Sequence, residues 1–501
     1  MKICLINPRF PLSLWDFSLC RDIDGSRFPF PPLPLATLAA LTPAGHEITV
    51  CDENIGPLDL NIQADVVGIT GYHAQKERVY ELAGIFQAMG ATVAIGGPIV
   101  RADNLEECAQ HANAVFLGEA EYTWPQFIRD FEAKIIKPFY IQDTFVDMKD
   151  SPAPRFDLLD FKAYSSAVIE TSRGCPHSCE FCAIPVRLGK GSRTKSTGQV
   201  MAEIYALHKL GADSIFIIDD NFLGNRKRAV ELLAEIGRFA ESIDYGVYFS
   251  CQFTIDTARD EEMLGLLEKA NFRRVFIGIE TPRKESLAAA KKNQNTRVDL
   301  LEAVRRIQAR NIIVWGAFIV GFDGDDKNIF EEQFRFIQAA AIPVAMLGIL
   351  QAIPGTPLYE RLKAEGRLLK DGTGGITGAA DGLLRTNVKL ARMGMEELVP
   401  GYGRMARNIY GYGNFARRLV AAIKTGSKNG PPGRGNAGSK EIAAVLRLLR
   451  YYLLSPDPRR AFMFVRVISQ TLIWDPRQLR TALMHLVVYK HLRLFYERTT
   501  R

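Results

Sequence analysis

The chain has 501 residues, of which 47% are hydrophobic and 24% charged, with a formal net charge of +7. This length and composition are typical of a folded protein of two or three domains and exclude a disordered chain. The first residues lack the pattern of a signal peptide, and charges such as Arg466 interrupt the longest apolar runs near the end. We therefore expect a cytoplasmic protein without a membrane span.

Residues 1–145 are predicted to form one α/β domain. Short apolar runs such as KICLINP, ADVVGIT, TVAIGG and NAVFLGE alternate with amphipathic stretches, which is typical of a Rossmann-like, doubly wound parallel sheet. Ligands of such sheets bind beyond the carboxyl ends of the strands. The small or polar residues at these strand ends are Asn7, Thr70, Gly71, Tyr72, Gly96, Gly97, Gly118 and Glu119. They either let a large ligand approach the backbone or only form tight turns between strands and helices.

A second α/β region is predicted from residue 146 to residue 365. Its candidate strands are AVIETSR, SIFIIDDN, VYFSCQF, RVFIGIE, IVWGAFIVGF and AMLGILQAIPG, and amphipathic helical stretches separate them. Six strands fall short of the eight of a closed barrel, so the expected fold is a partial (β/α)6 barrel. Functional side chains should then stand at the carboxyl ends of the strands.

Residues 366–501 are predicted to form a helical C-terminal domain with a flexible loop over residues 424–440. The segment 391–501 carries a net charge of +14, whereas residues 1–390 carry −7. Its basic amphipathic helices either lie on an anionic membrane surface or pack on the barrel and expose a basic face. Because no recognisable nucleic-acid-binding module accompanies this charge, we expect no nucleic-acid partner.

Three of the eight cysteines, Cys175, Cys179 and Cys182, lie close together in the stretch ETSRGCPHSCEFCAIP. Clustered thiols in a reducing compartment are more often metal ligands or catalytic groups than disulfides. A structural zinc site needs a fourth ligand, and His177 is too close in sequence to Cys175 and Cys179 to complete a tetrahedron easily. Three thiolates on a 4Fe-4S cube would instead leave one iron open to a ligand from outside the chain.

The spacing Cys175-x3-Cys179-x2-Cys182, with the aromatic Phe181 just before the third cysteine, resembles the signature of radical S-adenosylmethionine (SAM) enzymes. The resemblance implies that the open iron binds SAM. It also implies that one electron from the cluster cleaves SAM to a radical that takes hydrogen from an unactivated carbon. An external electron donor such as flavodoxin or ferredoxin would supply that electron.

By the same resemblance, groups at later strand ends would contact the cofactor or the substrate. They are Asp219 and Asp220 after the second barrel strand, Ser250 and Gln252 on one face of the third, Glu280 at the end of the fourth, and Gly316 and Ile353 near the adenine. The alternative for each polar residue is a capped strand end or a buried salt bridge. The sequence assigns no catalytic side chain.

The N-terminal sheet, placed before a radical domain, resembles that of the cobalamin-binding class of these enzymes. The stretches PPLPLATLAAL, DENI, IGGP and FLGEAEYTW carry this likeness. The chain departs from many cobalamin proteins because it has no D-x-H-x-x-G motif, and His73 follows the third strand instead of the first. The resemblance implies cobalamin held without a histidine ligand, or a site that has lost it, with His73 as a loop residue.

Further stretches, including IDDNFLGN, KKNQNT, ILQAIPGTPLYERLKAEGRL and ELVPGYGRMARNIY, resemble the subfamily that contains hopanoid C-2 methylases. This likeness implies a cobalamin-dependent radical SAM methyltransferase that acts on an unactivated carbon of a lipid, a tetrapyrrole or another natural product. The alternative is a cobalamin-dependent radical oxidoreductase, cyclase or ring-rearranging enzyme that transfers no methyl group. A metal-binding scaffold without turnover is the third reading. Fold and family do not by themselves fix the substrate.

Overall fold

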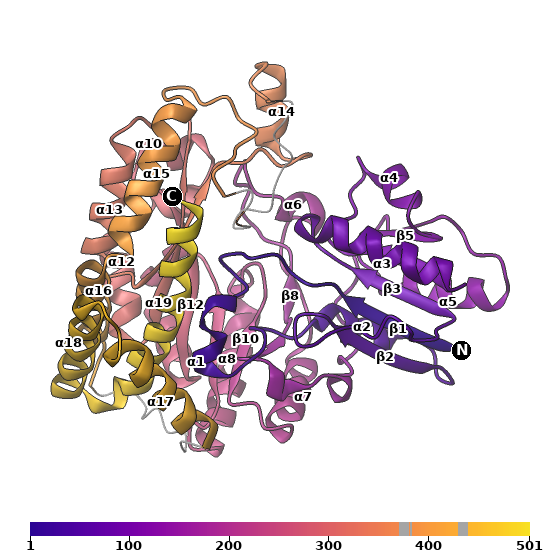
Figure 1. Ribbon diagram of the computed structural model, residues 1–501, viewed down its shortest axis with the longest axis horizontal. Helices are drawn as coiled ribbons and strands as arrows, with labels where there is room; N and C mark the ends of the chain where they lie inside the picture. Colours follow the sequence, from indigo (N-terminus) through magenta and orange to yellow (C-terminus); the bar gives the residue numbers. More distant parts are fainter. Residues whose placement is uncertain (370–379, 381–382, 429–438, 501) are drawn as a thin grey trace. The chain divides into compact units, whose positions relative to one another are not determined.

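A computed structural model of the chain (Figure 1) describes residues 1–369, 380, 383–428 and 439–500. The chain divides into two compact units. The first comprises residues 1–12, 26–169 and 193–212, and the second comprises residues 13–25, 170–192 and 213–501. The C-terminal helices thus share a unit with most of the barrel strands, and the division into three domains stays a prediction.

The first unit is built on a parallel sheet in the strand order β2-β1-β3-β4-β5-β6. The strands are β1 Lys2–Asn7, β2 Glu47–Asp52, β3 Val66–Thr70, β4 Thr92–Gly96, β5 Ala114–Leu117 and β6 Phe139–Ile141. The order reverses beside β1, which is the place where open α/β sheets bind ligands. The predicted doubly wound sheet is confirmed, and β6 is a strand that the sequence patterns did not identify.

Helices cover both faces of this sheet because its strands are apolar on both sides. On one face, Val79, Leu82 and Phe86 of α3 (Lys76–Ala88) pack on the sheet together with Cys108 of α4 (Leu105–Ala109). On the other, α2 (Leu33–Leu41) and α5 (Thr123–Glu132) contribute Leu35, Ala39, Trp124, Phe127 and Ile128. The further elements of the first unit are η2 His73–Gln75, η3 Phe156–Leu158, η4 Phe161–Ala163, β7 Ala167–Ile169, β9 Arg193–Thr194 and α7 Thr197–Lys209.

The second unit contains five parallel strands that follow one another in chain order across a sheet. They are β10 Ser214–Ile217, β11 Tyr248–Gln252, β12 Phe272–Glu280, β13 Ile313–Val320 and β14 Val344–Ile349. The helical elements between them are α8 Arg226–Ser242, η5 Ile255–Arg259, α9 Glu261–Lys269, α10 Lys284–Ala289, α11 Asn293–Thr296, α12 Leu300–Ala309 and α13 Ile329–Ala339. The expected first barrel strand, AVIETSR, is two short strands, β7 and β8 (Ser172–Arg173).

The two faces of this sheet differ in burial. Along β12, Val275, Ile277 and Ile279 are fully buried, as expected for the face that helices cover, whereas Arg274, Phe276 and Gly278 are half-buried. The register pairs Gln252 with Phe276 and Phe276 with Trp315, so neighbouring strands continue the same alternation. We call the other side the inner face; it carries the buried Ser250 and Trp315 and the half-buried Gln252, Arg274, Phe276, Gly278 and Ala317.

The C-terminal region is helical, as predicted, and packs on the edge of the sheet. Its helices are α14 Pro357–Ala364, α15 Met395–Ile409, α16 Tyr412–Thr425, α17 Ser439–Leu453, α18 Pro458–Trp474 and α19 Leu479–Thr499, with η6 Pro476–Gln478 between the last two. No helix among the described residues is both long and apolar enough to cross a membrane. Most of the predicted loop at 424–440 lies outside the described residues, although α16 extends to Thr425.

Three tyrosine hydroxyls form hydrogen bonds with backbone groups of β14, which is the terminal strand of its sheet. The hydroxyl of Tyr402 donates to Leu347 O at 2.8 Å and the hydroxyl of Tyr410 to Ala345 O at 2.7 Å. Leu347 N in turn donates to the hydroxyl of Tyr496 at 3.0 Å. Because an open strand edge invites aggregation, these hydroxyls replace a missing neighbouring strand and fix α15 and α19 to the sheet.

Residues 13–25 belong to the second unit although they lie near the start of the chain. They form η1 (Ser18–Cys20) and α1 (Arg21–Asp24), which contact α19 and α17. His491 of α19 fixes this segment, since its Nε2 lies 3.0 Å from Ser13 O and its Nδ1 accepts from Leu19 N at 3.3 Å. Figure 1 shows α1 and α19 together beside the strands of this unit.

Candidate functional site

The three clustered cysteines lie on one loop that follows β8 and ends at α6 (Ile184–Arg187). All three are free, with Cys179 buried and Cys175 and Cys182 half-buried. The loop turns at Gly174, which has a φ of +86° and where a Cβ would collide with the carbonyl oxygen of Gly191. Only glycine fits this turn, so the backbone brings the three thiols to one place.

Burial makes Cys175 and Cys182 poor nucleophiles in the absence of a metal. It raises the pKa of Cys182 to about 12 and that of Cys175 above its ordinary value. A thiol with such a pKa is protonated at neutral pH, and only a bound metal ion would displace its proton. Burial therefore argues against Cys175 and Cys182 as catalytic thiols.

The loop supplies three thiols, one fewer than the four ligands of a structural zinc site. Within the described ranges, no three His, Cys, Asp or Glu side chains are close enough together to hold one ion. In an iron-sulfur cube each thiolate binds a different iron, so the ligand sulfurs lie farther apart than around one zinc ion. His177, the remaining candidate for a fourth ligand, is a half-buried loop residue.

Amide side chains point at two of the sulfurs. Gln294 Nε2 lies 3.3 Å from Cys179 Sγ, and Asn221 Nδ2 lies 4.0 Å from Cys175 Sγ. The Oδ1 atom of Asn221 is buried and has no hydrogen-bond donor among the described residues. An orphaned buried acceptor is costly, so a donor from a bound ligand fits this position.

The two carboxylates after β10 both hold the start of the cysteine loop. Asp219 is fully buried and accepts from Thr171 N at 2.6 Å, from Thr171 Oγ1 at 2.5 Å and from Ser172 Oγ at 2.7 Å. Asp220 accepts from Gly174 N at 3.0 Å, and burial raises its pKa to about 6. Asp219 is therefore a structural anchor of the loop, whereas Asp220 is half-buried and retains one oxygen for a ligand.

The next strands present the other predicted groups. Ser250 and Gln252 share the inner face, as the strand alternation predicts, and Ser250 Oγ accepts from Arg274 Nη2 at 3.4 Å. Glu280 ends β12 with a φ of +64° and forms a buried ion pair with Lys292. A carboxylate in this pair is held in place and carries its charge into an apolar environment.

Gly316 and Ile353 differ in their surroundings. Gly316 alternates with Trp315 and so lies on the helix-covered face, where a Cβ would come within 2.7 Å of the Phe318 ring. Ile353 is half-buried in the loop after β14, and its carbonyl oxygen accepts from Thr356 N and Oγ1 at 3.1 and 2.7 Å. Ile353 is therefore partly accessible, whereas Gly316 lies in close packing behind the inner face.

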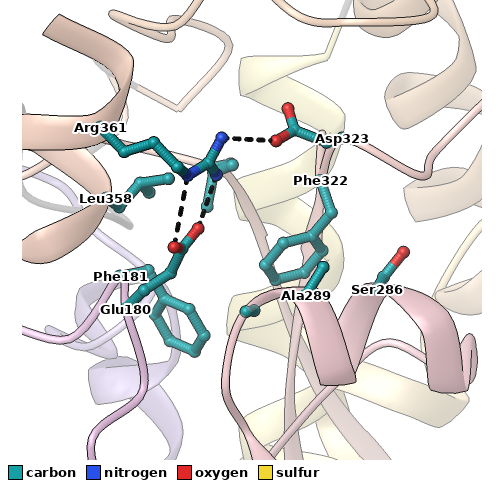
Figure 2. Close-up of a pocket in the computed structure, with 10 residues that line it drawn as sticks. Glu180, Phe181, Ser286, Ala289, Phe322, Asp323, Leu358 and Arg361 are labelled. Atoms are coloured by element: carbon teal, nitrogen blue, oxygen red, sulfur yellow. Dashed lines mark hydrogen bonds and ion pairs between the residues drawn. The ribbon is translucent and has the colours of Figure 1, made fainter. Parts of the chain in front are cut away.

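A network of charges holds the other side of the cysteine loop. Glu180, between Cys179 and Phe181, accepts from Arg361 Nη2 of α14 at 2.6 Å, and Arg361 Nη1 donates to Asp323 at 2.9 Å. Figure 2 shows the guanidinium between these two carboxylates, with Phe181 below it. The Phe181 ring meets that of Phe322 at 5.9 Å and lies under Lys292 Nζ at 5.7 Å.

In the first unit, the predicted ligand-binding residues follow the strands on one edge of the sheet. Asn7 Nδ2 donates to Asp52 at 3.0 Å, and Glu119 holds Arg193 with two hydrogen bonds of 2.9 and 3.1 Å. These two side chains have protein partners. Tyr72 is 48% exposed, and its ring contacts that of Phe10 with the centroids 5.6 Å apart.

The glycines of this edge permit close contact between backbones. Gly97 and Gly118 have φ of +86° and +93°, and a Cβ at Gly97 would lie 2.5 Å from Thr70 Oγ1 and 3.4 Å from Gly71 N. At Gly96 the Cβ of Phe116 would be 3.3 Å away. The ends of β3 and β4 are therefore packed closely, and a side chain at Gly97 would collide with Thr70.

Comparison with known proteins gives the family. Residues 169–337 match the model of the radical SAM superfamily, and residues 356–501 match a domain of unknown function, DUF4070. An uncharacterized methyltransferase of Synechocystis is 36% identical over 75% of this chain and 71% of its own length. Hopanoid C-2 methylase of Rhodopseudomonas palustris is 32% identical over 74% of this chain and 71% of its own. The chain belongs to the radical SAM superfamily.

Solved structures agree with this fold. The radical SAM enzyme OxsB, determined with cobalamin and SAM, matches 99% of this chain and 80% of its own at a TM-score of 0.64 and 16% identity. The methyltransferase TsrM of Kitasatospora setae, determined with cobalamin and a 4Fe-4S cluster, matches 81% of this chain and 85% of its own at 0.59 and 16%. Among radical SAM proteins the chain thus combines a Rossmann-like sheet, a partial barrel and C-terminal helices.

Several groups around the radical SAM loop were not predicted from the sequence. KKNQNT was noted only for its likeness to the family, yet its Lys292 and Gln294 reach Glu280 and Cys179. Arg361 lies far along the chain from the cysteine motif, and only the fold brings it to Glu180. Nothing in the sequence marks these residues as partners of the loop, because the chain has many other Lys and Arg residues that could form such ion pairs.

Proposed function

We propose that the protein is a cobalamin-dependent radical SAM methyltransferase that acts on an unactivated carbon of a lipid, a tetrapyrrole or another natural product. The observation that carries the proposal is a three-cysteine loop at the carboxyl ends of parallel strands. This loop stands in a chain that is 36% and 32% identical to proteins named methyltransferase and methylase. When bound, the cluster with SAM supplies hydrogen abstraction, and cobalamin supplies the methyl group.

The cluster would be held by Cys175, Cys179 and Cys182. Gln294 donates to Cys179, and Lys292 brings a positive charge that offsets the charge of the thiolates. Because Lys292 is also paired with Glu280, it is fixed in place. These groups let three negative sulfurs remain in a largely buried loop.

SAM would bind across the carboxyl ends of β10 to β14. Polar positions for it are Asp220, Gln252 and Glu280, while Phe181 and Ile353 supply apolar contact. Asp219 and Ser250 act more indirectly, since one anchors the loop and the other accepts a hydrogen bond from Arg274. Gly316 keeps β13 close to its neighbours.

Cobalamin would bind at the carboxyl edge of the first unit's sheet. The backbone at Thr70, Gly71, Gly96, Gly97 and Gly118 admits a flat ring, and the exposed Tyr72 can pack on it. Asn7 and Glu119 would shape this edge through Asp52 and Arg193. His73 is not required as a ligand in this arrangement, and burial lowers its pKa below the usual range.

The product of the reaction distinguishes methyl transfer from the alternative of a cyclase that transfers no methyl group. Anaerobic magnesium-protoporphyrin IX monomethyl ester cyclase of Cereibacter sphaeroides is 27% identical over 43% of this chain. The reconstituted protein is incubated with reductant, methyl-deuterated SAM and lipid or tetrapyrrole fractions, and products are weighed by mass spectrometry. A product that gains the labelled methyl group supports the proposal, whereas 5′-deoxyadenosine with an unlabelled product supports the alternative.

We further propose that a small one-electron carrier of the flavodoxin or ferredoxin type reduces the cluster.

We also propose that α17 and α18 contact an anionic membrane. Apolar side chains are exposed along both helices, at Ile442, Leu446, Leu453, Leu454, Phe462, Val465, Leu472 and Ile473. The sequence of α18 contains no acidic residue, and Arg450 and Arg466 are exposed among these positions. Exposed apolar stripes with cations fit the interface of an anionic bilayer.

A further inference from the structure

Arg274 is a cation on the inner face without a carboxylate partner. Among the residues that the structure describes, its guanidinium donates to Ser250 Oγ at 3.4 Å and to Met484 Sδ at 3.6 Å, and forms no ion pair. Both contacts are long, and a guanidinium has five N–H donors. Most of its hydrogen-bonding capacity is therefore unused.

The charge of Arg274 is poorly compensated in its surroundings. Its guanidinium lies over the ring of Trp315 at 4.6 Å, and burial lowers its pKa. Trp315 is held in turn, since its Nε1 donates to His485 Nε2 at 3.0 Å. Because Nδ1 of His485 lies 2.8 Å from Thr481 O and burial lowers the pKa of His485 to about 4, the imidazole is neutral and brings no negative charge.

An apolar surface adjoins this cation. Phe276 lies two residues along β12 on the same face, and Trp15 packs on it edge to face at 5.3 Å. Trp15 is 40% exposed although the segment that carries it is fixed by His491. A large aromatic side chain that is held rigidly yet remains exposed is available to a ligand.

We propose that Arg274 binds an anionic group, a carboxylate or a phosphate, of a substrate whose apolar body packs on Trp15 and Phe276. Arginine matches both oxyanions because its planar fork donates two parallel hydrogen bonds. The proposal rests on the function proposed above and narrows its substrate class to amphipathic anions.

Arg274 would bind an anionic group that lies away from the substrate carbon that reacts. Ser250, which pairs with Arg274 in register, is two residues before the end of β11. Glu280 lies six residues farther along β12, or about 20 Å at the usual rise of a strand. Gln252, at the end of β11, pairs with Phe276, so a substrate that packs on Phe276 would lie between the SAM site and Arg274.

The test uses the reconstituted full-length protein and inorganic phosphate as the probe, followed by equilibrium dialysis. Arg274→Gln should weaken phosphate binding at one site about tenfold or more. Arg273→Gln is the matched control, because Arg273 is the preceding residue of β12 and already donates to Asn271 Oδ1 at 2.7 Å. Equal phosphate binding by wild type and Arg274→Gln overturns the proposal.

A second arm separates the substrate from SAM as the source of the anion. Reductive cleavage of SAM without substrate should stay within about twofold of wild type in Arg274→Gln. A fall of about tenfold in this cleavage would assign Arg274 to the SAM carboxylate and overturn the proposal. Neither phosphate binding nor SAM cleavage requires methyl transfer to occur. A failure of the proposed function would instead be detected in the product analysis described above.

Arg274→Lys covers the case in which the glutamine variant does not assemble its cluster. Lysine keeps the charge but lacks the fork, so phosphate should bind more weakly by about threefold. Unchanged binding in a folded lysine variant, with the Arg273→Gln control also unchanged, overturns the proposal.

Discussion

The guanidinium of Arg361 on α14 binds the carboxylate of Glu180, which stands between two residues of the cysteine loop, Cys179 and Phe181. The Nη2 to Oε1 distance is 2.6 Å, and the residues are 181 positions apart in the chain. Glu180 is nearly buried, so the ion pair fixes the middle of the loop to a distant helix. The pair links the packing of α14 to the geometry of the thiols.

Replacement of Arg361 by methionine should loosen the cysteine loop. The Glu180 carboxylate would lose its partner, at a cost of about 1–2 kcal/mol in unfolding free energy because Arg361 is partly exposed. Iron should then be lost to a chelator several times faster, as measured by absorbance. Arg335→Met, which breaks an exposed pair with Glu331, is the control and should change stability by less than about 0.5 kcal/mol.

Cluster assembly should depend on the thiols of the loop alone. Cys179→Ala should prevent assembly, because one iron would lose its ligand. Cys251→Ala is the matched control, since Cys251 is a buried cysteine of β11 in the same unit. Iron and sulfide analysis after anaerobic reconstitution distinguishes the two. Loss of the cluster in the Cys251 variant would show that the ligand set is wrong.

Lys292 and Glu280 should behave as a coupled pair. Lys292→Met leaves a buried carboxylate unpaired, which typically costs about 3–5 kcal/mol. Adding Glu280→Gln removes that charge and should restore about half of the loss or more. Denaturant unfolding of both single variants and the double variant measures this coupling. Additive losses in the double variant would mean that the ion pair does not form.

Asp325 should make stability depend on pH in a defined direction. Burial raises its pKa to about 6, although Gly321 N and Phe322 N donate to it. A folded-state pKa above the unfolded value of about 3.9 means that the folded protein binds the proton more tightly. This carboxyl therefore destabilises the fold increasingly as pH rises from about 4 to 6, by about 3 kcal/mol in total.

Asp325→Asn removes this titration while its amide oxygen can still accept the same N–H groups. The variant should gain stability relative to wild type as pH rises from 4 to 7, and the difference should be constant above pH 7. Guanidinium unfolding of the two proteins at several pH values measures it. A difference that does not vary with pH would contradict the raised pKa.

Membrane contact should depend on the exposed apolar residues of α17 and α18. The wild type should float with vesicles rich in anionic lipid and should float less in high salt, because charge contributes to the attraction. Phe462→Ser with Ile473→Ser should reduce flotation severalfold. Ile135→Ser, at a residue that is also 62% exposed but lies in the first unit, is the control. A wild type that never floats excludes this contact.

The sequence predicted the strands and the cysteine loop because their signals are local. Alternating apolar runs identified β1, β3, β4 and β5, and a fixed spacing identified Cys175, Cys179 and Cys182. The short strand β6 was missed, since three residues are too few to show a period. The break between β7 and β8 was also missed, because the tertiary contacts of Thr171 with Asp219 determine it.

The partners of the site could not be predicted, because they come from distant parts of the chain. Nothing local shows that Arg361 meets Glu180, or that residues 13–25 join the second unit. The strand ends were identified correctly as polar, but sequence alternation alone did not distinguish Asp219, an anchor of the loop, from Asp220. The helix-covered position of Gly316 follows from its register with Ile277.

The visible absorption spectrum of the anaerobically purified and reconstituted chain tests the central claim most directly. Iron-sulfur and cobalamin bands are separable, and the account predicts both, with one cluster and one cobalamin per chain. Cys179→Ala should lose the first band and keep the second. Iron-sulfur absorption alone, with no cobalamin retained even after its addition, would contradict methyl transfer by this route.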